Sequence, residues 1–349
     1  MNRPLTTFFF SLIAAGLSVL ILLLLIGESP SVFFEAFYHT LFTPFGLGYT
    51  LYHATPLMLT GLSVALCFHC GLFNIGAEGQ LYWGSMGIVL ASYYVHPSTP
   101  WIAIPFGFLV CILAGGIWGG IAGFLKATRG AHEVLVTILL NFIALSTIDY
   151  LTVRAFHNPE LQNAETIPIP SAFHLPPASA LLPAFSGTPL NVAFLIAILC
   201  CIGVHVFLFY TSTGFEMRAT GKNASASQHV GIRVARSGTL AFFMSGSLAG
   251  LVGVNEVMGH AHRVIDGFSP GYGFSGIAVS LVARNHPLWI PFSAILFGAL
   301  HNSSRELEFL SDKVSKEFSL VIQGTLIFIT LLNLPEVRHW WRFFRRSEA

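Results

Sequence analysis

The most unusual chemistry in this chain is a set of carboxylates and carboxamides placed inside or beside long apolar segments. Burying such a group costs free energy unless it finds a hydrogen-bond partner, and an ionisable residue at membrane depth points by default to a functional site. Each is therefore a candidate for lining a polar path, the alternative being a hydrogen bond that only joins two helices. The set comprises Asn74, Glu78, Gln80, Glu133, Asn141, Asn255 and Glu256.

The densest part of this set lies in the octapeptide from Phe73 to Gln80, which reads Phe-Asn-Ile-Gly-Ala-Glu-Gly-Gln. Gly71, Gly76 and Gly79 permit a break in a helix because glycine adopts backbone conformations closed to other residues. Inside a membrane, a broken helix is tolerated only where it faces protein or a water-filled cavity. The octapeptide thus predicts a helix break that faces a path.

Composition indicates the protein class that must position these groups. Of the 349 residues, 54% are hydrophobic and 9% charged, against about 25% charged in an ordinary soluble domain. The net charge of +1 argues against a nucleic-acid-binding face. The five cysteines lie in apolar segments, and Cys67 and Cys70 lack the second pair that a metal site would need. We expect an all-α polytopic membrane protein with no metal site.

Windows of about 20 residues predict about ten transmembrane segments. The first is longer than a signal-peptide core and precedes no small-x-small cleavage site, so we expect it to be retained. The eighth and ninth are short and contain glycine, which is compatible with half-helices or a re-entrant pair. The segments are 6–27, 50–70, 79–96, 101–125, 134–155, 191–211, 238–258, 272–284, 287–303 and 318–334, and together they form one membrane domain over residues 1–349.

Glycines repeat at four-residue spacing within two of these segments. Gly115, Gly119 and Gly123 form one series, and Gly246 and Gly250 form another. Small residues at this spacing let helix backbones approach closely. We expect tight helix packing, and a moving hinge is the alternative.

Orientation follows from the basic residues, which favour the cytoplasmic side of a membrane. With both termini inside, twelve Lys and Arg fall on the cytoplasmic side and five on the other. The proline-rich loop 156–190 contains Glu160 and Glu165 but neither Lys nor Arg, so it is predicted to be external. The tail 335–349 is basic and cytoplasmic, and the octapeptide also falls on the cytoplasmic side.

The largest cytoplasmic loop, 211–237, is where such a protein would meet a cytoplasmic partner. Asn223 is a good N-cap residue, and the Ala-rich sequence after it predicts a helix of about two turns suited to docking into a groove. A solvated basic loop that only sets topology is the alternative. Gly221 and Lys222 resemble the end of a phosphate-binding loop, but Asn223 replaces the Ser or Thr that follows, so no nucleotide site is expected.

Several of these motifs together resemble the permease subunits of bacterial ABC importers for nucleosides, within a group that also contains simple-sugar and branched-chain amino-acid permeases. The octapeptide is the most specific part, and ribose-type permeases usually carry an Asp-Leu-Ser-Val-Gly-like string where this chain has Asn74 to Glu78. The other similar parts are Ala131-His132-Glu133-Val134 with Thr137 and Asn141, the loop from Gly214 to Gly231, and Ser245-Gly246 with Ala249, Gly250 and Gly253.

The resemblance implies about ten helices in a bacterial inner membrane and alternating access to a path for nucleosides. It also implies a cytoplasmic ATP-binding subunit that uses ATP-Mg, an external substrate-binding protein and a second permease, identical or not, while this chain binds no cofactor. The ATPase would dock on the loop 211–237, with coupling residues Gly214, Glu216, Arg218, Gly221, Asn223 and Gly231.

Other function classes fit the residues less well. An enzyme would need a paired nucleophile and base or a metal-ligand set, and the chain has neither His-Glu-x-x-His nor Gly-x-Ser-x-Gly. A simple-sugar permease is the nearest alternative. A secondary transporter driven by an ion gradient is a further alternative, since it too uses polar breaks in helices.

Overall fold

The computed structural model describes residues 29–310, apart from 96 and 98, together with a few isolated positions on either side. Within this part of the chain the elements are helices, and no strand is present. The main helices are α2 (Pro30–Phe42), α3 (Pro44–His69), α4 (Ala77–Tyr94), α5 (Pro100–Arg129), α6 (Glu133–Tyr150) with its π-helical extension η1 (Leu151–Ala155), α7 (Ala193–Tyr210), α8 (Ser212–Lys222), α9 (Ala224–His229), α10 (Val234–Gly250) with its π-helical continuation η5 (Val254–Ala261), α11 (Tyr272–Val282) and α12 (Ile290–Leu310).

Five of these helices are long and apolar enough to cross a membrane, which confirms a helical membrane protein with several spans. They cover 44–69, 100–129, 133–155, 193–210 and 234–261 and match five of the predicted segments. The predicted segments 79–96 and 287–303 correspond to α4 and α12. The predicted segments 6–27 and 318–334 and the tail 335–349 lie outside the continuously described residues.

The eighth predicted segment is a half-helix. It appears as α11, which has 11 residues and is therefore about 17 Å long, against a hydrocarbon core of about 30 Å. A tight turn at Ala283–His286 follows α11, with Arg284 and Asn285 in the left-handed region, and η6 (Pro287–Trp289) then leads into α12. The segments 272–284 and 287–303 thus form a short helix that turns back into a longer one.

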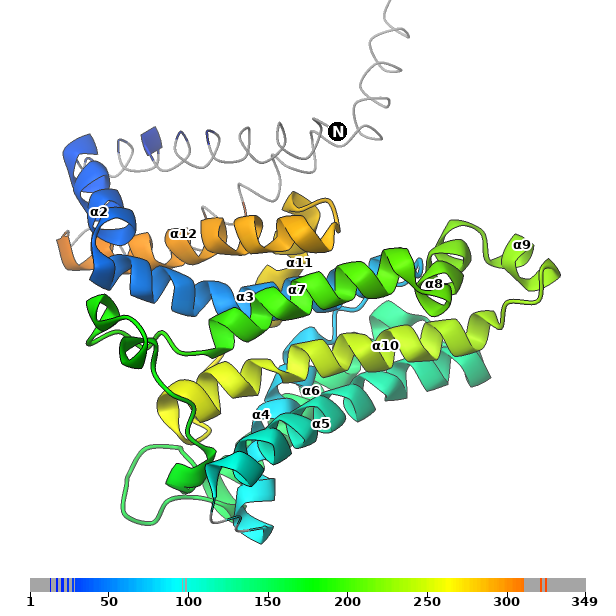
Figure 1. The fold of residues 1–349 in the computed structure, drawn as a ribbon, viewed down its shortest axis with the longest axis horizontal. Coiled ribbons are helices and arrows are strands. Elements are labelled where there is room, and N and C mark those ends of the chain that lie inside the picture. Colours follow the sequence, from blue (N-terminus) through cyan, green and yellow to red (C-terminus); the bar gives the residue numbers. More distant parts are fainter. Residues whose placement is uncertain are drawn as a thin grey trace, which may run out of the picture.

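Helix α3 lies at the centre of the fold and is buried along most of its length. The glycine series confirm the expected close packing between α5 and α10, which run side by side (Figure 1). A Cβ placed on Gly115 would lie 2.8 Å from the Cα of Gly250, and one on Gly119 would lie 3.1 Å from the Cα of Gly246. Backbone therefore packs directly on backbone at this interface.

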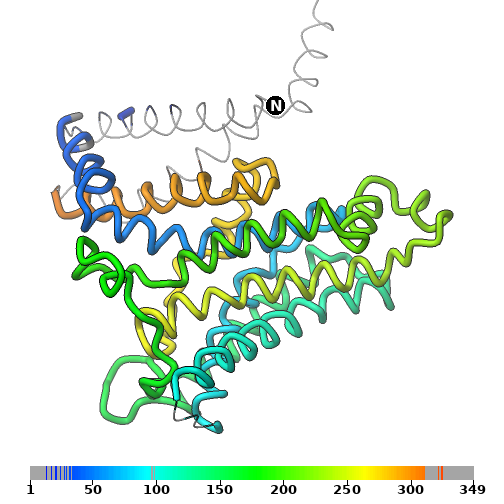
Figure 2. Tube along the Cα trace, viewed as in Figure 1, coloured from blue at the N-terminus to red at the C-terminus, as the bar shows by residue number. Residues whose placement is uncertain are grey.

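The two ends of the bundle differ in charge. The end that carries α8 and α9 (Figure 2) also holds the basic residues predicted for the cytoplasmic side. These are, within the described residues, Lys126, Arg129, Arg218, Lys222, Arg233, Arg236 and Arg284. The opposite end holds Arg154, Arg263 and Arg305.

The loop 156–190 lies at that opposite end and is folded against the segment after η5. The amide of Thr166 donates to the carbonyl of Val264 at 2.9 Å, and the amide of Ile169 donates to that of His262 at 2.8 Å. Arg263 and Glu165 form an ion pair at 2.8 Å. This long loop is therefore an ordered cover over one end of the bundle.

The close contact of α5 with α10 predicts that enlarging Gly115 will destabilise the fold. Gly115→Leu places a side chain against Gly246 and Gly250, and overpacking of this kind costs about 1–3 kcal/mol. The matched control is Gly203→Leu in α7, where a Cβ would meet nothing within 4 Å. We expect a lower melting temperature for the detergent-purified Gly115 variant alone, and equal melting temperatures would contradict the packing described.

Candidate functional site

The helix break predicted at the octapeptide is present, but it extends deeper into the bundle than expected. The backbone is irregular from Cys70 to Gly76. It begins against Gly221 of α8, since a Cβ on Gly71 would lie 2.9 Å from the Cα of Gly221. It ends beside Asn141, which lies about 12 Å along α6 from the first residue of that helix. The octapeptide was predicted to lie at the end of the bundle that carries the basic residues, and it instead runs from that end into the interior, because the chain turns inward after Gly71.

Asn74 holds the inner part of this break. Its Oδ1 accepts from the amide of Gly76 at 2.8 Å, and its Nδ2 donates to Gln80 Oε1 at 2.9 Å and to Ser245 Oγ at 2.8 Å. Gln80 Nε2 donates back to Asn74 Oδ1 at 3.2 Å. Both donors of the Asn74 amide group are used and its oxygen accepts twice, so this residue holds the break and joins it to α10.

Asn141 performs the same task from α6. Its Oδ1 accepts from the amide of Gly79 at 2.9 Å, and its Nδ2 donates to the carbonyl of Ile75 at 2.9 Å. One carboxamide therefore satisfies two backbone groups that the helix break leaves unpaired. Backbone groups without partners are costly in an apolar interior, so Asn141 makes the break possible.

Glu78 joins the starts of two helices. Its side chain is buried, and its Oε2 accepts from the amide of Gly273 at 2.6 Å. Gly273 is the second residue of the half-helix α11, and Glu78 is the second residue of α4. A carboxylate at the N-terminus of a helix is stabilised by the helix dipole and the free amides there. The two helices therefore begin against each other inside the bundle.

Asn255 and Glu256 belong to a second polar cluster on η5. Tyr52 Oη donates to Glu256 Oε2 at 2.6 Å, and Asn255 Nδ2 donates to Glu256 Oε1 at 3.0 Å. Asn191, at the end of the long loop, donates to Asn255 Oδ1 at 3.2 Å. Sequence reasoning missed Tyr52 and Asn191, because the first lies in an apolar run and the second reads as loop.

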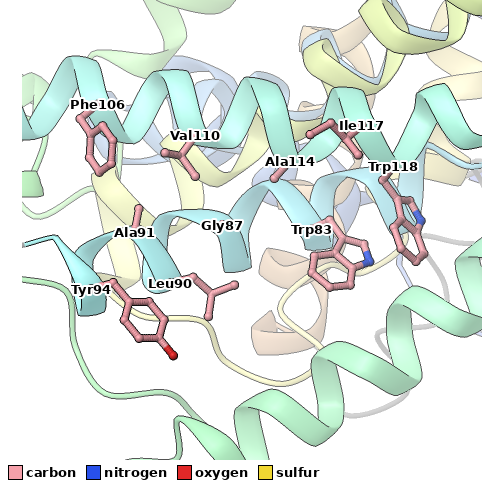
Figure 3. Close-up of a pocket in the computed structure, with 10 residues that line it drawn as sticks. All are labelled: Trp83, Gly87, Leu90, Ala91, Tyr94, Phe106, Val110, Ala114, Ile117 and Trp118. Carbon is pink, nitrogen blue, oxygen red and sulfur yellow. The ribbon is translucent and has the colours of Figure 1, made fainter.

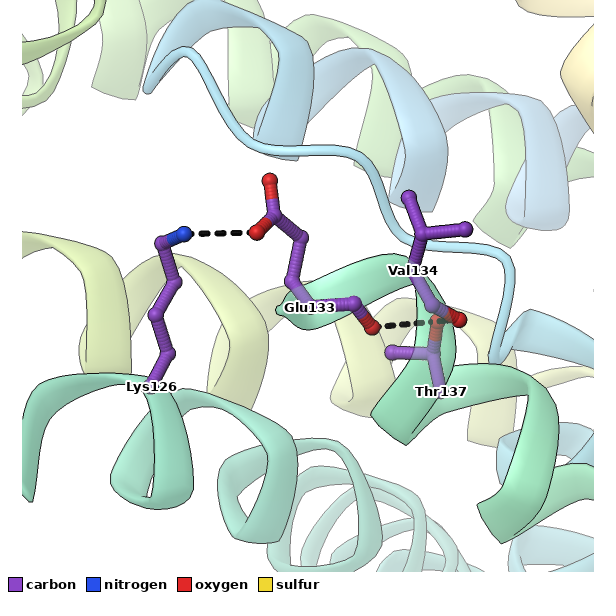
Figure 4. Close-up of polar contacts among 4 residues, drawn as sticks. All are labelled: Lys126, Glu133, Val134 and Thr137. Atoms are coloured by element: carbon purple, nitrogen blue, oxygen red, sulfur yellow. Dashed lines mark hydrogen bonds and ion pairs between the residues drawn. The ribbon is translucent and has the colours of Figure 1, made fainter. Parts of the chain in front are cut away.

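Glu133 is separate from both clusters. It pairs with Lys126 of α5 at 2.5 Å across the turn between α5 and α6 (Figure 4). Thr137 Oγ1 donates to the carbonyl of Glu133 at 2.8 Å, one turn back along α6. The structure therefore places Glu133 at the end of the bundle that carries α8 and α9, in an ion pair that joins the end of α5 to the start of α6.

A cavity of about 470 Å³ lies between α4 and α5 and has an apolar lining (Figure 3). Trp83, Phe106 and Trp118 supply much of that lining, and neither a carboxylate nor a carboxamide belongs to it. The cavity suits an apolar occupant such as a lipid chain. It is distinct from both polar clusters.

The loop 211–237 contains two helices rather than one. Asn223 caps α9 as predicted, because its Oδ1 accepts from the amide of Ala226 at 3.0 Å. The helix α8, which precedes it, was not predicted. Phe215 and Val230 are 59% and 76% exposed at this end of the molecule. The loop thus presents apolar side chains on a rigid support.

The predicted coupling residues divide into supports and surface groups. At Gly214 and Gly221 another part of the backbone packs directly against the glycine. A Cβ on Gly214 would lie 2.7 Å from the Cα of Leu208, and one on Gly221 would lie 2.7 Å from the amide nitrogen of Gly71. Arg218 Nε donates to the carbonyl of Leu208 at 2.8 Å, and Gly231 has a φ of +88°. Glu216 and Asn223 are exposed.

The contacts of Asn141 predict a structural role that mutation can test. Asn141→Ala leaves the amide of Gly79 and the carbonyl of Ile75 unpaired, at about 1–3 kcal/mol for each buried group. We expect a marked loss of folded protein in size-exclusion chromatography, while Asn163→Ala, at an exposed loop position, keeps the wild-type yield. A stable Asn141 variant with slow transport would instead indicate contact with the transported solute.

Comparison with known proteins identifies the family. Residues 46–331 match the family described as branched-chain amino acid transport system / permease component. The chain is 31% identical to the guanosine ABC transporter permease protein NupP of Bacillus subtilis, over 91% of this chain and 90% of that one. It is 32% identical to the nucleoside ABC transporter permease protein NupB of Lactococcus lactis, over 88% and 85%.

A third relative is named for a sugar. The glucose ABC transporter permease protein TsgB13 of Haloferax volcanii is 32% identical, over 78% of this chain and 72% of that one. The family match and these similarities agree with a bundle of apolar helices interrupted by polar breaks. The chain therefore belongs to the branched-chain amino acid transport system / permease component family and is a membrane permease subunit of the nucleoside and simple-sugar ABC importer type.

Proposed function

We propose that this chain moves nucleosides into the cell by alternating access, driven by ATP hydrolysis in a partner subunit. The observation that carries this proposal is the similarity to the guanosine permease over nine-tenths of both chains. The sugar-permease relative matches a smaller share of both chains. The simple-sugar permease is the second candidate, and an ion-coupled transporter is the third.

The geometry supports transport of an uncharged solute. Two helices, α4 and α11, begin against each other inside the bundle around Glu78 and Gly273. Interrupted helices of this kind form transport sites in other membrane transporters. A nucleoside offers hydroxyls and base edges to polar groups and an aromatic face to ring side chains. The cluster of Glu256, Asn255 and Tyr52 contains polar groups that could bond such hydroxyls and base edges, and an aromatic ring that could contact the base.

The two ends of the bundle suit two different partners. We assign α8 and α9 to the cytoplasm, where they would dock a separate ATP-binding subunit that uses ATP-Mg. The folded loop 156–190 would then face the external substrate-binding protein. The basic residues around α8 support this orientation, which also places both termini in the cytoplasm. The assembled importer would contain a second permease and lie in a bacterial inner membrane, with no cofactor bound by this chain.

The energy source provides the first functional test. The permease is reconstituted in vesicles with its ATPase and binding protein, and uptake of radiolabelled guanosine and glucose is measured. We expect guanosine uptake only with ATP and all subunits present. Preferential glucose uptake would favour the sugar-permease alternative, and uptake driven by an ion gradient in vesicles that contain this chain alone would overturn the ABC assignment.

The exposed end of the loop provides the second test. Phe215→Asp places a charge on an exposed apolar position of α8. Docking of the ATPase would have to remove water from this carboxylate, so we expect ATPase binding to weaken about tenfold or more, and each factor of ten corresponds to about 1.4 kcal/mol. The control Leu181→Asp changes an exposed residue at the opposite end. We expect loss of ATPase co-purification only for Phe215→Asp. If both variants co-purify with the ATPase as well as the wild-type chain does, the loop 211–237 only sets the membrane topology.

A further inference from the structure

The outer surfaces of this bundle are of two kinds. Helices α5, α6 and α7 expose apolar residues, among them Leu109, Phe142 and Leu199, which suit contact with lipid. The surface where α3, η5 and α12 meet instead exposes His260 and Arg305, with His301 partly exposed beside them. Ionisable side chains against lipid tails are costly. This surface therefore suits contact with water or protein better than contact with lipid tails.

The exposed groups belong to a cluster of rings, here called the histidine cluster, formed by Tyr52, His53, His260 and His301. The rings of Tyr52 and His260 lie 5.1 Å apart, and those of His53 and His301 lie 4.5 Å apart. Arg305 lies beside this cluster, over the ring of Tyr49 at 5.3 Å. The cluster thus combines aromatic faces with hydrogen-bonding groups on three elements.

His53 leaves one hydrogen-bonding atom of this cluster unused. It is 7% exposed, and its Nδ1 lies 3.1 Å from Tyr272 Oη. Its Nε2 is buried and has no hydrogen-bond partner. A buried polar atom without a partner costs free energy, so a water molecule or a solute hydroxyl that reached this nitrogen would stabilise the imidazole.

The cluster lies within the membrane-spanning part of the bundle and leads toward the helix break. His53 lies in the first half of α3, about 14 Å along the helix from its first residue. The first residues of α3 lie at the end of that helix away from α8 and α9 (Figure 1). Tyr272, its partner, begins α11, and the next residue, Gly273, donates to Glu78. A solute at the cluster would therefore be adjacent to the start of both interrupted helices.

We infer that the histidine cluster is a solute-binding vestibule that takes a small uncharged solute with an aromatic ring and hydroxyl groups. The rings of Tyr52, His260 and His301 would contact its aromatic face, and His53 Nε2 would hydrogen-bond one of its polar atoms. This inference rests on the proposed function and assigns the entry side of the path to the α3, η5 and α12 surface. Burial of the same surface by the second permease is the competing explanation.

Cysteine labelling in the assembled importer tests the vestibule directly. The native Cys67, Cys70, Cys111 and Cys201 are buried and Cys200 is partly exposed, so the wild-type chain gives the background. His260→Cys and His301→Cys are treated with a charged, membrane-impermeant maleimide. The matched control is Leu199→Cys, which lies on the apolar surface of α7. Labelling is repeated with guanosine or glucose delivered by the binding protein.

We expect the two cluster variants to label well above background, Leu199→Cys to remain at background, and guanosine to slow labelling of the cluster several-fold. Labelling at background would show that the second permease or lipid covers the cluster, and would overturn the vestibule. Labelling that neither solute slows would overturn solute binding. Slowing by glucose alone would overturn both the aromatic solute inferred for the cluster and the nucleoside assignment.

A substitution at His53 supplies a second readout from the same complex. His53→Ala removes the free nitrogen and should lower uptake about two- to tenfold, the value of one hydrogen bond, whereas His53→Gln restores part of it because an amide keeps a polar atom there. His39→Gln, at an exposed position on α2, is the control. Wild-type uptake by a fully folded His53→Ala complex would contradict the role of His53.

Discussion

The fold depends on satisfying the backbone groups of an irregular segment that runs through an apolar interior. Between α3 and α4 the chain is not helical, so its amides and carbonyls lack the partners that a helix would supply. Asn141 and Asn74 supply those partners from side chains. Because they do, α4 can begin inside the bundle, and Glu78 can meet the start of α11. The polar residues of the octapeptide are thus primarily the supports of an interrupted helix.

The same segment connects this break to the end of the bundle that carries α8. Gly71 lies directly on Gly221 of α8, with no side chain between them. A displacement of α8 would therefore reach the break through backbone contact within a few residues. Beside the break, α5 and α10 are joined by glycines and form a closely packed pair. The molecule combines this closely packed pair of helices with an interrupted pair, α4 and α11, an arrangement that supports the proposed alternating access.

Much of the architecture follows from local properties of the sequence. Long apolar runs predicted the five helices that are able to span a membrane, because length and hydropathy suffice for that assignment. Glycine spacing predicted close helix packing but not that α5 and α10 are the partners, and Asn223 predicted a helix start. The sequence could not predict which polar residues bond to each other, since partners such as Asn74 and Ser245 are far apart in the chain. Tyr52 and His53 gave no signal, because a polar aromatic residue within an apolar run reads as part of a span.

By itself, then, the sequence determined that this protein is a helical membrane permease, where five of its apolar spans lie and which segments carry its basic residues. These properties depend on composition, on short motifs and on residues close together in the chain. Only the tertiary structure decided which groups the polar residues contact. It paired Asn74 and Asn141 with backbone groups of the break, paired Glu133 with Lys126, and brought His53 beside His301. A hydrogen bond depends on which atoms meet in three dimensions, and that is set by how the helices pack.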